Sequence, residues 1–279
     1  MSEYVYFNGA YSRFDEASVP LTDRGIYFGD GCYDVMLIKD GIPYQLDEHF
    51  QRLAGNCEKL GIAFSLTQRR LLSIIHRLCD LSCISTAVIY VQVTRNGGRR
   101  RHEFSSPPSE SNLLVTVSEY KAPRLRSLKA ITLPDRRHTI CNVKSLNLLY
   151  SVLALHSANE KECDAAIFVR NGIVTEEARS NVFIVKDGEL QTHPLDENIL
   201  PGVVRGKIIG LANLLGIGVT EIKFTPSDML TADEVFISST TKFLSVISEI
   251  DGIQLNGTNT SVSGKLFDAL LCDFIERTR

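Results

Sequence analysis

Apolar side chains in the first half of the chain recur with two different periods. Between residues 46 and 60 they stand three or four positions apart, which predicts a helix with one buried face. That face consists of Leu46, Phe50, Leu53, Cys57 and Leu60. A second helix is expected over about 67–79, with Leu71, Ile75 and Leu78 directed inward. Residues 87–95 alternate between apolar and polar side chains and predict a half-buried strand.

Asn-Gly and Asp-Gly pairs divide much of the chain into short segments. Such pairs favour the tight turns that join antiparallel strands. They occur at Asn8-Gly9, Asp40-Gly41, Asn171-Gly172, Asp187-Gly188 and Asp251-Gly252. Helical spacing is found after Ser145, after Pro201-Gly202 and near the C-terminus. Because strand hairpins are interleaved with helices without a regular βαβ order, we predict an α+β chain in two lobes.

The 279 residues are too many for one small core. Composition shifts after residue 118, and Pro123 would interrupt strand pairing there. We therefore predict a small N-terminal α/β domain over 1–118, a linker over 119–124 and a large C-terminal α+β domain over 125–279.

Composition and charge exclude several classes of protein. Apolar residues make up 44% and charged residues 23%, and a net charge of -3 gives no general attraction to nucleic acid or acidic membranes. We expect no export signal at the N-terminus and no membrane span, because no apolar run is long enough. Seven scattered cysteines without metal-ligand spacing are typical of reduced thiols, so we expect a soluble cytoplasmic protein without a metal site.

Lys144 lies between a strand-like approach and a predicted helix. The helix would begin at Ser145, which is placed to cap its first turn, and its apolar positions are Leu146, Leu149 and Leu153. A lysine at such a junction can be held rigidly and point into a cleft, as a covalent catalyst must. The alternative is a solvated lysine just before a helix.

If Lys144 forms a Schiff base with pyridoxal phosphate, the chain must also supply an anion for the ring nitrogen and a cradle for the phosphate. Glu176, at the end of a predicted hairpin strand, is the candidate anion; the alternative is an exposed glutamate. Candidates for the phosphate cradle are the helix start at Gly202-Val203-Val204, the run Ser239-Thr240-Thr241 and Arg52. Each of these features alone is also typical of an ordinary turn or helix.

Short motifs in a fixed order connect the chain to a known family. They are Asp23-Arg24-Gly25, Phe28-Gly29-Asp30-Gly31, Tyr33, Glu48-His49, Arg52-Leu53, Gln92-Val93-Thr94-Arg95, Lys144-Ser145-Leu146-Asn147, Thr175-Glu176, Ser180-Asn181-Val182-Phe183, Ile199-Leu200, Gly202 and Ser239-Thr240-Thr241. With these motifs the chain resembles, nearly end to end, the fold-type IV (class IV) pyridoxal-phosphate-dependent aminotransferases, and within them the D-amino-acid transaminases. The resemblance implies a two-lobed enzyme with its active site between the lobes.

The resemblance also implies a role for each candidate residue. Lys144 would be the catalytic Schiff-base lysine, and Glu176 would pair with the ring nitrogen. The other cofactor contacts would come from Arg52, Leu200, Val203, Val204, Ser239 and Thr240. Thr241 would contact the substrate. Because Val204 replaces a threonine of the family, one hydrogen bond to the phosphate would be lost, worth about 1 kcal/mol.

D-amino-acid transaminases bind the substrate carboxylate with a tyrosine and an Arg-x-His pair. Tyr33, Arg100 and His102 fit these positions. In the family the arginine and histidine reach the neighbouring active site, so the resemblance implies a homodimer. The alternative for Arg99-Arg100-Arg101 is a solvated basic loop.

The implied reaction is ping-pong transfer of an amino group between D-amino acids, such as D-alanine and D-glutamate, and 2-oxo acids. Alternatives of the same fold are an aminodeoxychorismate lyase and a branched-chain L-amino-acid aminotransferase. Alternatives of another class are a non-catalytic cofactor carrier and a binding module that uses the basic loop. Ala178-Arg179 departs from the small Gly/Ser-type pair of the family, and Arg179 could crowd the pocket, fold outward or touch a substrate side-chain carboxylate.

Overall fold

A computed structural model describes residues 4–105, 110–255 and 261–279, and the chain divides into two compact units. Unit 1 consists of Met1–Ala122, Val143–Asn147 and Arg277–Arg279, and unit 2 of Pro123–Asn142 and Leu148–Glu276. Each unit combines helices with a β-sheet and has its own buried apolar cluster. The α+β prediction is therefore confirmed.

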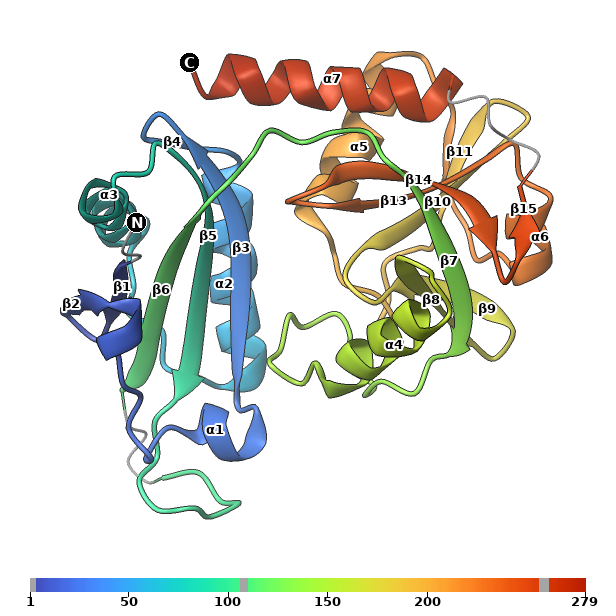
Figure 1. Ribbon diagram of the computed structural model, residues 1–279. Helices are drawn as coiled ribbons and strands as arrows, with labels where there is room; N and C mark the ends of the chain where they lie inside the picture. The colour runs from blue at the N-terminus through green and yellow to red at the C-terminus, as the bar shows by residue number, and fades with distance from the viewer. Residues whose placement is uncertain (1–3, 106–109, 256–260) are drawn as a thin grey trace. The chain divides into compact units, whose positions relative to one another are not determined.

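The described part of unit 1 forms one six-stranded antiparallel sheet in the order β2-β1-β6-β5-β3-β4. Its strands are β1 (Tyr4–Phe7), β2 (Ala10–Arg13), β3 (Gly31–Lys39), β4 (Ile42–Pro43), β5 (Thr86–Arg95) and β6 (Ser111–Glu119). Two short helices, η1 (Phe14–Glu16) and α1 (Arg24–Phe28), precede β3. The longer helices α2 (Leu46–Leu60) and α3 (Gln68–Ser82) pack along the sheet (Figure 1).

Both long helices of unit 1 bury the apolar face that the sequence predicts. Leu53 and Cys57 of α2 lie in one cluster with the inward residues of α3 and with alternate side chains of β5. The helix ends also follow from the sequence. The Thr67 hydroxyl accepts the Arg70 amide at the start of α3 (3.2 Å), and Gly61 adopts the left-handed conformation that ends α2.

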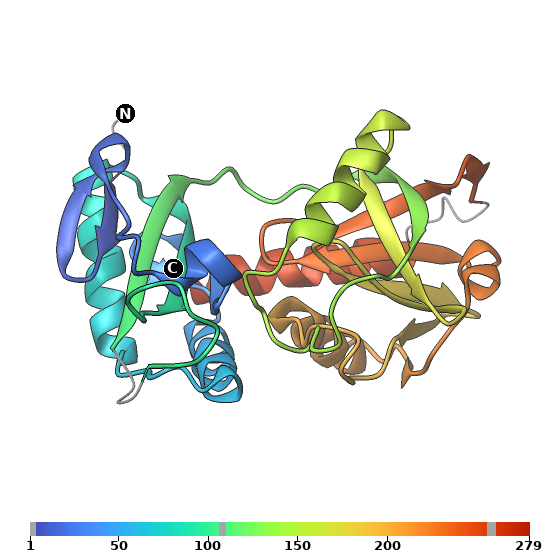
Figure 2. The ribbon, with the colours of Figure 1, turned by 90° about the horizontal axis from the view of Figure 1, so that it is seen from below.

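In unit 2, the described strands form a nine-stranded mixed sheet with the path β12-β11-β10-β13-β14-β7-β8-β9, and β15 pairs with β14. Its strands are β7 (Ser127–Pro134), β8 (Ala165–Arg170), β9 (Ile173–Glu177), β10 (Asn181–Lys186), β11 (Glu189–Thr192), β12 (Val219–Glu221), β13 (Glu234–Ser239), β14 (Phe243–Ile250) and β15 (Ile253–Gln254). The helices are α4 (Leu149–Glu160), α5 (Val203–Leu214), α6 (Pro226–Leu230) and α7 (Ser261–Arg277). α4 packs against β7 and β8, and α5 against β12 and β13 (Figures 1 and 2).

The five predicted turns are confirmed. Each Asn or Asp of the Asn-Gly and Asp-Gly pairs has a positive φ, and so does the glycine that follows it. This is the backbone conformation that two-residue hairpin turns require.

The prediction that Ser145 caps a helix is wrong. Ser145 forms a β-bridge with Cys32, and α4 begins only at Leu149, after an N-cap residue, Leu148, that makes no side-chain cap. Pairing with β3 uses the backbone groups that a helix would need. Leu149 and Leu153 lie on the helix, but their side chains are 73% and 51% exposed, so this apolar spacing does not mark a face that the chain itself buries.

No helix in the described ranges is long and apolar enough to cross a bilayer. The same ranges hold no group of three or more His, Cys, Asp and Glu side chains able to bind a metal ion. All seven cysteines are unpaired, and Cys83 and Cys272 are the exposed ones.

Candidate active site

Lys144 is held against the first residues of β3. The Tyr33 amide donates to the Lys144 carbonyl (3.0 Å), and the Leu146 amide donates to the Gly31 carbonyl (3.1 Å). Position 31 requires glycine, because a Cβ there would lie 2.6 Å from the Val93 carbonyl oxygen. β3 is paired with β5 over its whole length, so the backbone of Lys144 is fixed by a rigid strand.

The side chain of Lys144 lies beside Tyr33, on the sheet face that α2 and α3 leave uncovered. The Nζ atom of Lys144 is 4.3 Å from the centroid of the Tyr33 ring. Tyr33 stacks on Tyr90 (centroids 5.4 Å apart), and the Tyr90 hydroxyl donates to Gln92 (2.7 Å). Among the described residues no carboxylate forms an ion pair with Lys144, which leaves its amine available for covalent chemistry.

Arg52 is oriented by Asp34, which follows Tyr33 and points to the opposite face of β3. Asp34 is fully buried and accepts hydrogen bonds from Nδ1 of His49 (2.7 Å) and from Nε and Nη2 of Arg52 (both 2.8 Å). Burial alone would raise the pKa of Asp34, but the charge of Arg52 and the bond from His49 hold it well below its ordinary value. Burial lowers the pKa of His49, and the positive charges of Arg52 and Lys144 add to this effect. At neutral pH His49 is thus a neutral donor to an ionised Asp34.

The loop that carries Arg100 and His102 is anchored by the buried side chain of Arg24. Its Nη1 donates to the Arg101 carbonyl (2.5 Å) and its Nη2 to the His102 carbonyl (3.2 Å). Phe28 contacts both candidate side chains: its ring centroid is 5.2 Å from Cζ of Arg100 and 5.3 Å from the His102 ring. Both side chains are exposed, and no described contact joins them to Tyr33 or Lys144 of the same chain.

A β-bulge sets the direction of Glu176 in unit 2. Ile167 pairs with Glu177 but Val169 pairs with Val174, so β9 contains one more residue than β8 in this interval. The extra residue of a β-bulge changes the direction in which the neighbouring side chains point. As a result, the consecutive residues Thr175 and Glu176 both reach the pair formed by Asp135 and Arg137: Thr175 donates to Asp135 (2.9 Å), and Glu176 accepts from Arg137.

Arg137 is a fixed positive charge against the Glu176 carboxylate. Its Nε and Nη2 donate to the two oxygens of Asp135 (2.9 and 2.7 Å), and its Cζ lies 4.6 Å from the centroid of the Phe168 ring. Burial would lower the pKa of Arg137, but the hydrogen bond to Asp135 and the charge of Glu176 raise it. Burial would likewise raise the pKa of Asp135, and Arg137 holds it below its ordinary value. Both groups therefore stay ionised at neutral pH.

The second oxygen of Glu176 is held by the segment that leads into α5. The Leu200 amide (3.0 Å) and Nδ2 of Asn181 (3.3 Å) both donate to Oε2. Asn181 also donates to the Leu200 carbonyl (2.9 Å). Gly202 lies against the side-chain amide of Asn181, and a Cβ at position 202 would overlap its Oδ1 atom. Within unit 2 the structure therefore brings together the predicted residues Glu176 and Leu200 and explains the glycine beside them.

The start of α5 has no side-chain cap among the described residues, so its first backbone amides are candidate donors. Gly202 is its N-cap, and no side chain caps the first turn, to which Val203 and Val204 belong. The Val204 side chain is buried, so this residue offers only its amide. Ser239 ends β13, and Thr240 and Thr241 form the turn that follows. The uncapped amides, the glycine against them and the buried Glu176 carboxylate are a donor and acceptor set that fits a phosphorylated pyridine.

Four polar residues that support the site were not singled out from the sequence. They are Asp34, Asp135, Arg137 and Arg170, the last of which contributes a second ion pair to Asp135 (3.0 Å). His49 was quoted in a motif but without a role. Asp34 had a detectable signal, because it is a charged residue in the inward register of a strand whose neighbours Cys32 and Met36 are apolar.

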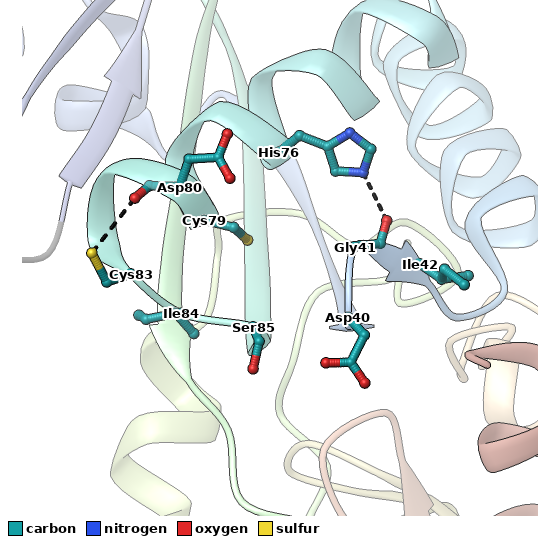
Figure 3. A pocket seen from close by; sticks show the side chains of 9 residues that line it. All are labelled: Asp40, Gly41, Ile42, His76, Cys79, Asp80, Cys83, Ile84 and Ser85. Atoms are coloured by element: carbon teal, nitrogen blue, oxygen red, sulfur yellow. Dashed lines mark hydrogen bonds between the residues drawn. The ribbon is translucent and has the colours of Figure 1, made fainter.

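A separate hollow of about 830 Å³ lies at the far end of β3 (Figure 3). It is lined by Asp40, Gly41, Ile42, His76, Cys79, Asp80, Cys83, Ile84 and Ser85. His76 hydrogen-bonds through Nε2 to the Gly41 carbonyl (2.7 Å) and so ties α3 to the β3–β4 turn. Lys144 is hydrogen-bonded to Tyr33, which lies six residues before the strand's last residue, Lys39, and so about 20 Å from that end at about 3.4 Å per residue; the hollow is therefore not part of the lysine site.

Known proteins resemble this chain over most of its length. Residues 31–250 match the model of the amino-transferase class IV family. The D-alanine aminotransferase of Bacillus licheniformis is 36% identical over 250 residues, which make up 89% of this chain and 88% of that protein. The D-alanine aminotransferase of Staphylococcus epidermidis is 37% identical over 251 residues, 89% of each chain. The structure of Escherichia coli branched-chain amino acid aminotransferase superposes with a TM-score of 0.90 at 24% identity, over 100% of this chain and 97% of that one, and confirms the predicted fold.

Proposed function

Because this chain belongs to the class IV aminotransferase family, we propose that it transfers the amino group between D-amino acids and 2-oxo acids with pyridoxal 5′-phosphate as its cofactor. D-alanine and D-glutamate are the proposed donors. The observation that carries the proposal is the rigid pairing of Lys144 with β3, which holds an unpaired amine beside Tyr33. The names of the relatives support the choice of D-amino acids.

The proposed cofactor supplies an aldehyde that reacts with amines and a ring that accepts electrons from the substrate α-carbon. We assign Lys144 to the aldehyde and Glu176 to the ring nitrogen, which this carboxylate would keep protonated. Leu200 would pack on the ring. The phosphate contacts are Arg52, the amides of Val203 and Val204, and the residues Ser239 and Thr240.

Lys144 then acts as the base. As a neutral amine, its Nζ removes the proton from the α-carbon of the bound amino acid. Tyr33, whose ring lies 4.3 Å from this nitrogen, limits the directions from which the α-carbon can approach. Thr241 contacts the substrate.

We assign the substrate α-carboxylate to Tyr33 together with Arg100 and His102 from a partner subunit, so that the enzyme works as a homodimer. An arginine with a tyrosine can hold a carboxylate in a fixed plane and thereby select the D-enantiomer. The dimer is supported by α4, where Leu149, Val152 and Leu153 form an apolar face that is 73%, 59% and 51% exposed in the single chain. We further propose that the protein works in the cytoplasm, in keeping with its seven free cysteines.

The decisive assay incubates the purified protein with pyridoxal phosphate, D-alanine and 2-oxoglutarate. We expect pyruvate and D-glutamate in equal amounts, and neither product when L-alanine replaces D-alanine. Lys144→Ala should abolish turnover, whereas Lys39→Ala, at the last residue of β3, should not. Pyruvate released in large excess over the enzyme without an amino acceptor would indicate a lyase, because a transaminase then releases only one pyruvate per active site. Preferential use of L-leucine would indicate a branched-chain enzyme, and either result contradicts the proposal.

The carboxylate assignment is tested in mixed dimers. Arg100→Ala should raise the KM for D-alanine and leave the affinity for pyridoxal phosphate unchanged, and Arg99→Ala is its matched control. If Arg100 serves the neighbouring site, then unfolding and refolding an equal mixture of Lys144→Ala and Arg100→Ala should restore roughly one quarter of wild-type activity, because half of the dimers are hybrids with one intact site in two. No recovery above the activity of the unmixed variants would show that Arg100 acts in its own subunit, and an Arg100→Ala enzyme as active as the wild type would show that it does not act on the substrate.

A further inference from the structure

Two turns lie side by side at one end of the sheet of unit 2. Residues 178–180 connect β9 to β10, and residues 240–242 connect β13 to β14. β10 and β13 are antiparallel partners in which the first residue of β10, Asn181, pairs with Ser238 near the end of β13. The two turns therefore leave the same edge of the sheet from adjacent strands, and this brings Arg179 close to Thr240 and its neighbours.

The two turns carry more positive than negative charge. Arg179 is exposed and Lys242 is half-buried, while Glu177 is only 1% exposed. Lys242 is attracted by Glu177 and repelled by Arg179, so the three groups lie within electrostatic reach of one another. Burial lowers the pKa of Lys242 below its ordinary value.

The carboxylate of Glu177 does not neutralise this site fully. Its Oε2 accepts the backbone amide of Arg179 (2.9 Å). Its Oε1 is buried and has no hydrogen-bond partner among the described residues. The charge of this buried carboxylate attracts Lys242, which Arg179 repels.

The guanidinium of Arg179 differs from the buried guanidinium groups of the described chain. Six arginines form close ion pairs with a carboxylate in a buried or half-buried setting: Arg24, Arg52, Arg95, Arg137, Arg170 and Arg205. Arg179 forms none within the described ranges, although it lies at a turn that adjoins the proposed phosphate and substrate residues. It is therefore able to bind an incoming carboxylate through two parallel N–H donors.

We propose that Arg179 and Lys242 form an anion subsite for the second carboxylate of a dicarboxylic substrate, so that the enzyme favours D-glutamate and 2-oxoglutarate over D-alanine and pyruvate. The subsite rests on the proposed function, which places substrate at the adjacent Thr241. The α-carboxylate is assigned to other residues, so a substrate with one carboxylate does not need this subsite. Binding of the second carboxylate would reduce the repulsion between the two cations.

The test compares two amino acceptors that differ in this carboxylate. The enzyme is first converted to its amino form with D-alanine and separated, and kcat/KM is then measured with 2-oxoglutarate and with pyruvate by the change in cofactor absorbance. For Arg179→Ser and Lys242→Ser we expect kcat/KM with 2-oxoglutarate to fall about tenfold or more, as expected for loss of a charge-assisted hydrogen bond, while the value with pyruvate changes less than about twofold. Lys186→Ser removes an exposed cation from the other end of β10. This control should leave the ratio of kcat/KM with 2-oxoglutarate to kcat/KM with pyruvate unchanged.

Three results would overturn the subsite. A ratio of the two kcat/KM values that stays at the wild-type level in both variants shows that neither cation recognises the second carboxylate. A weaker affinity for pyridoxal phosphate with an unchanged ratio shows that the cations act on the phosphate instead. If the ratio falls equally in Lys186→Ser and in the variants of Arg179 and Lys242, the effect is one of net charge only. Absence of turnover with all four substrates in the wild-type enzyme would instead refute the proposed function, and the subsite with it.

Discussion

Replacing Asp34 with asparagine is expected to destabilise unit 1 by about 3 kcal/mol. The carboxylate is fully buried and accepts two parallel bonds from Arg52, whose side chain is only 9% exposed. The substitution removes the counter-charge and turns one acceptor into an amide that faces the donors of Arg52. Breaking a buried ion pair by removing one partner costs about 3–5 kcal/mol. We expect a loss of stability at the lower end of this range, because His49 can still donate to the side-chain carbonyl oxygen of the asparagine.

The loss of stability caused by Asp34→Asn should become smaller at acidic pH. Arg52 and His49 hold the pKa of Asp34 below its value in the unfolded chain, which is about 3.9. A carboxylate of this kind stabilises the fold fully above its unfolded pKa and loses that contribution as the pH falls. The difference in stability between the wild type and Asp34→Asn should therefore be constant between about pH 7 and 5 and become smaller below about pH 4.

Urea unfolding followed by circular dichroism, at one fixed concentration of pyridoxal phosphate, measures this difference. With a slope of about 1.5 kcal/mol/M, a loss of 3 kcal/mol lowers the midpoint by about 2 M. Asp40→Asn is the matched control, because its side chain is 62% exposed at a turn and asparagine accepts the same positive φ. Equal midpoints for the wild type and Asp34→Asn, or an equal fall in Asp40→Asn, would refute the reasoning.

Two further perturbations test the start of α5 and the thiols. Gly202→Ala should weaken pyridoxal phosphate binding about tenfold or more in an absorbance titration, because its Cβ overlaps the Asn181 amide that holds Glu176. Gly210→Ala, whose Cβ meets nothing within 4 Å, should bind the cofactor like the wild type, and the same affinity in both variants would contradict the assignment. Ellman's reagent should modify Cys83 and Cys272 quickly and the five buried thiols only after unfolding, since burial keeps reagents out and raises the pKa of thiols such as Cys79, to about 11. Rapid loss of more than two thiols from the native protein would show that one of the two cores opens.

The periodic parts of the fold could be predicted because their causes are local. The two helices of unit 1 were predicted from apolar spacing, and their ends coincide with Thr67 and Gly61, whose preferences are intrinsic. The segment around Ser145 could not be predicted in this way. Its serine and its apolar spacing are typical of a helix start, but the partner that competes for its backbone, β3, is more than one hundred residues earlier in the chain.

The candidate site shows the same division. Lys144 and Glu176 were predicted from the sequence because the chemistry of an aldehyde cofactor demands an amine and an anion, and because the order of motifs matched a family. Arg137 was not found, because an arginine two residues after an aspartate has no distinctive pattern. Its importance depends on the bulge in β9, which turns Glu176 toward it, and on the burial of Asp135.

The sequence by itself determined the secondary elements with strong periods, the hairpin turns and the family, and it singled out Lys144 as the candidate lysine. Each of these follows from side chains that act on their own neighbourhood or from motifs in a fixed order. Only the tertiary structure decided which charges are buried together, how Arg52 and Glu176 are oriented, and that Arg179 forms no ion pair with a carboxylate of the described residues. These are contacts between residues far apart in the chain, and their energies depend on burial, which no local pattern specifies.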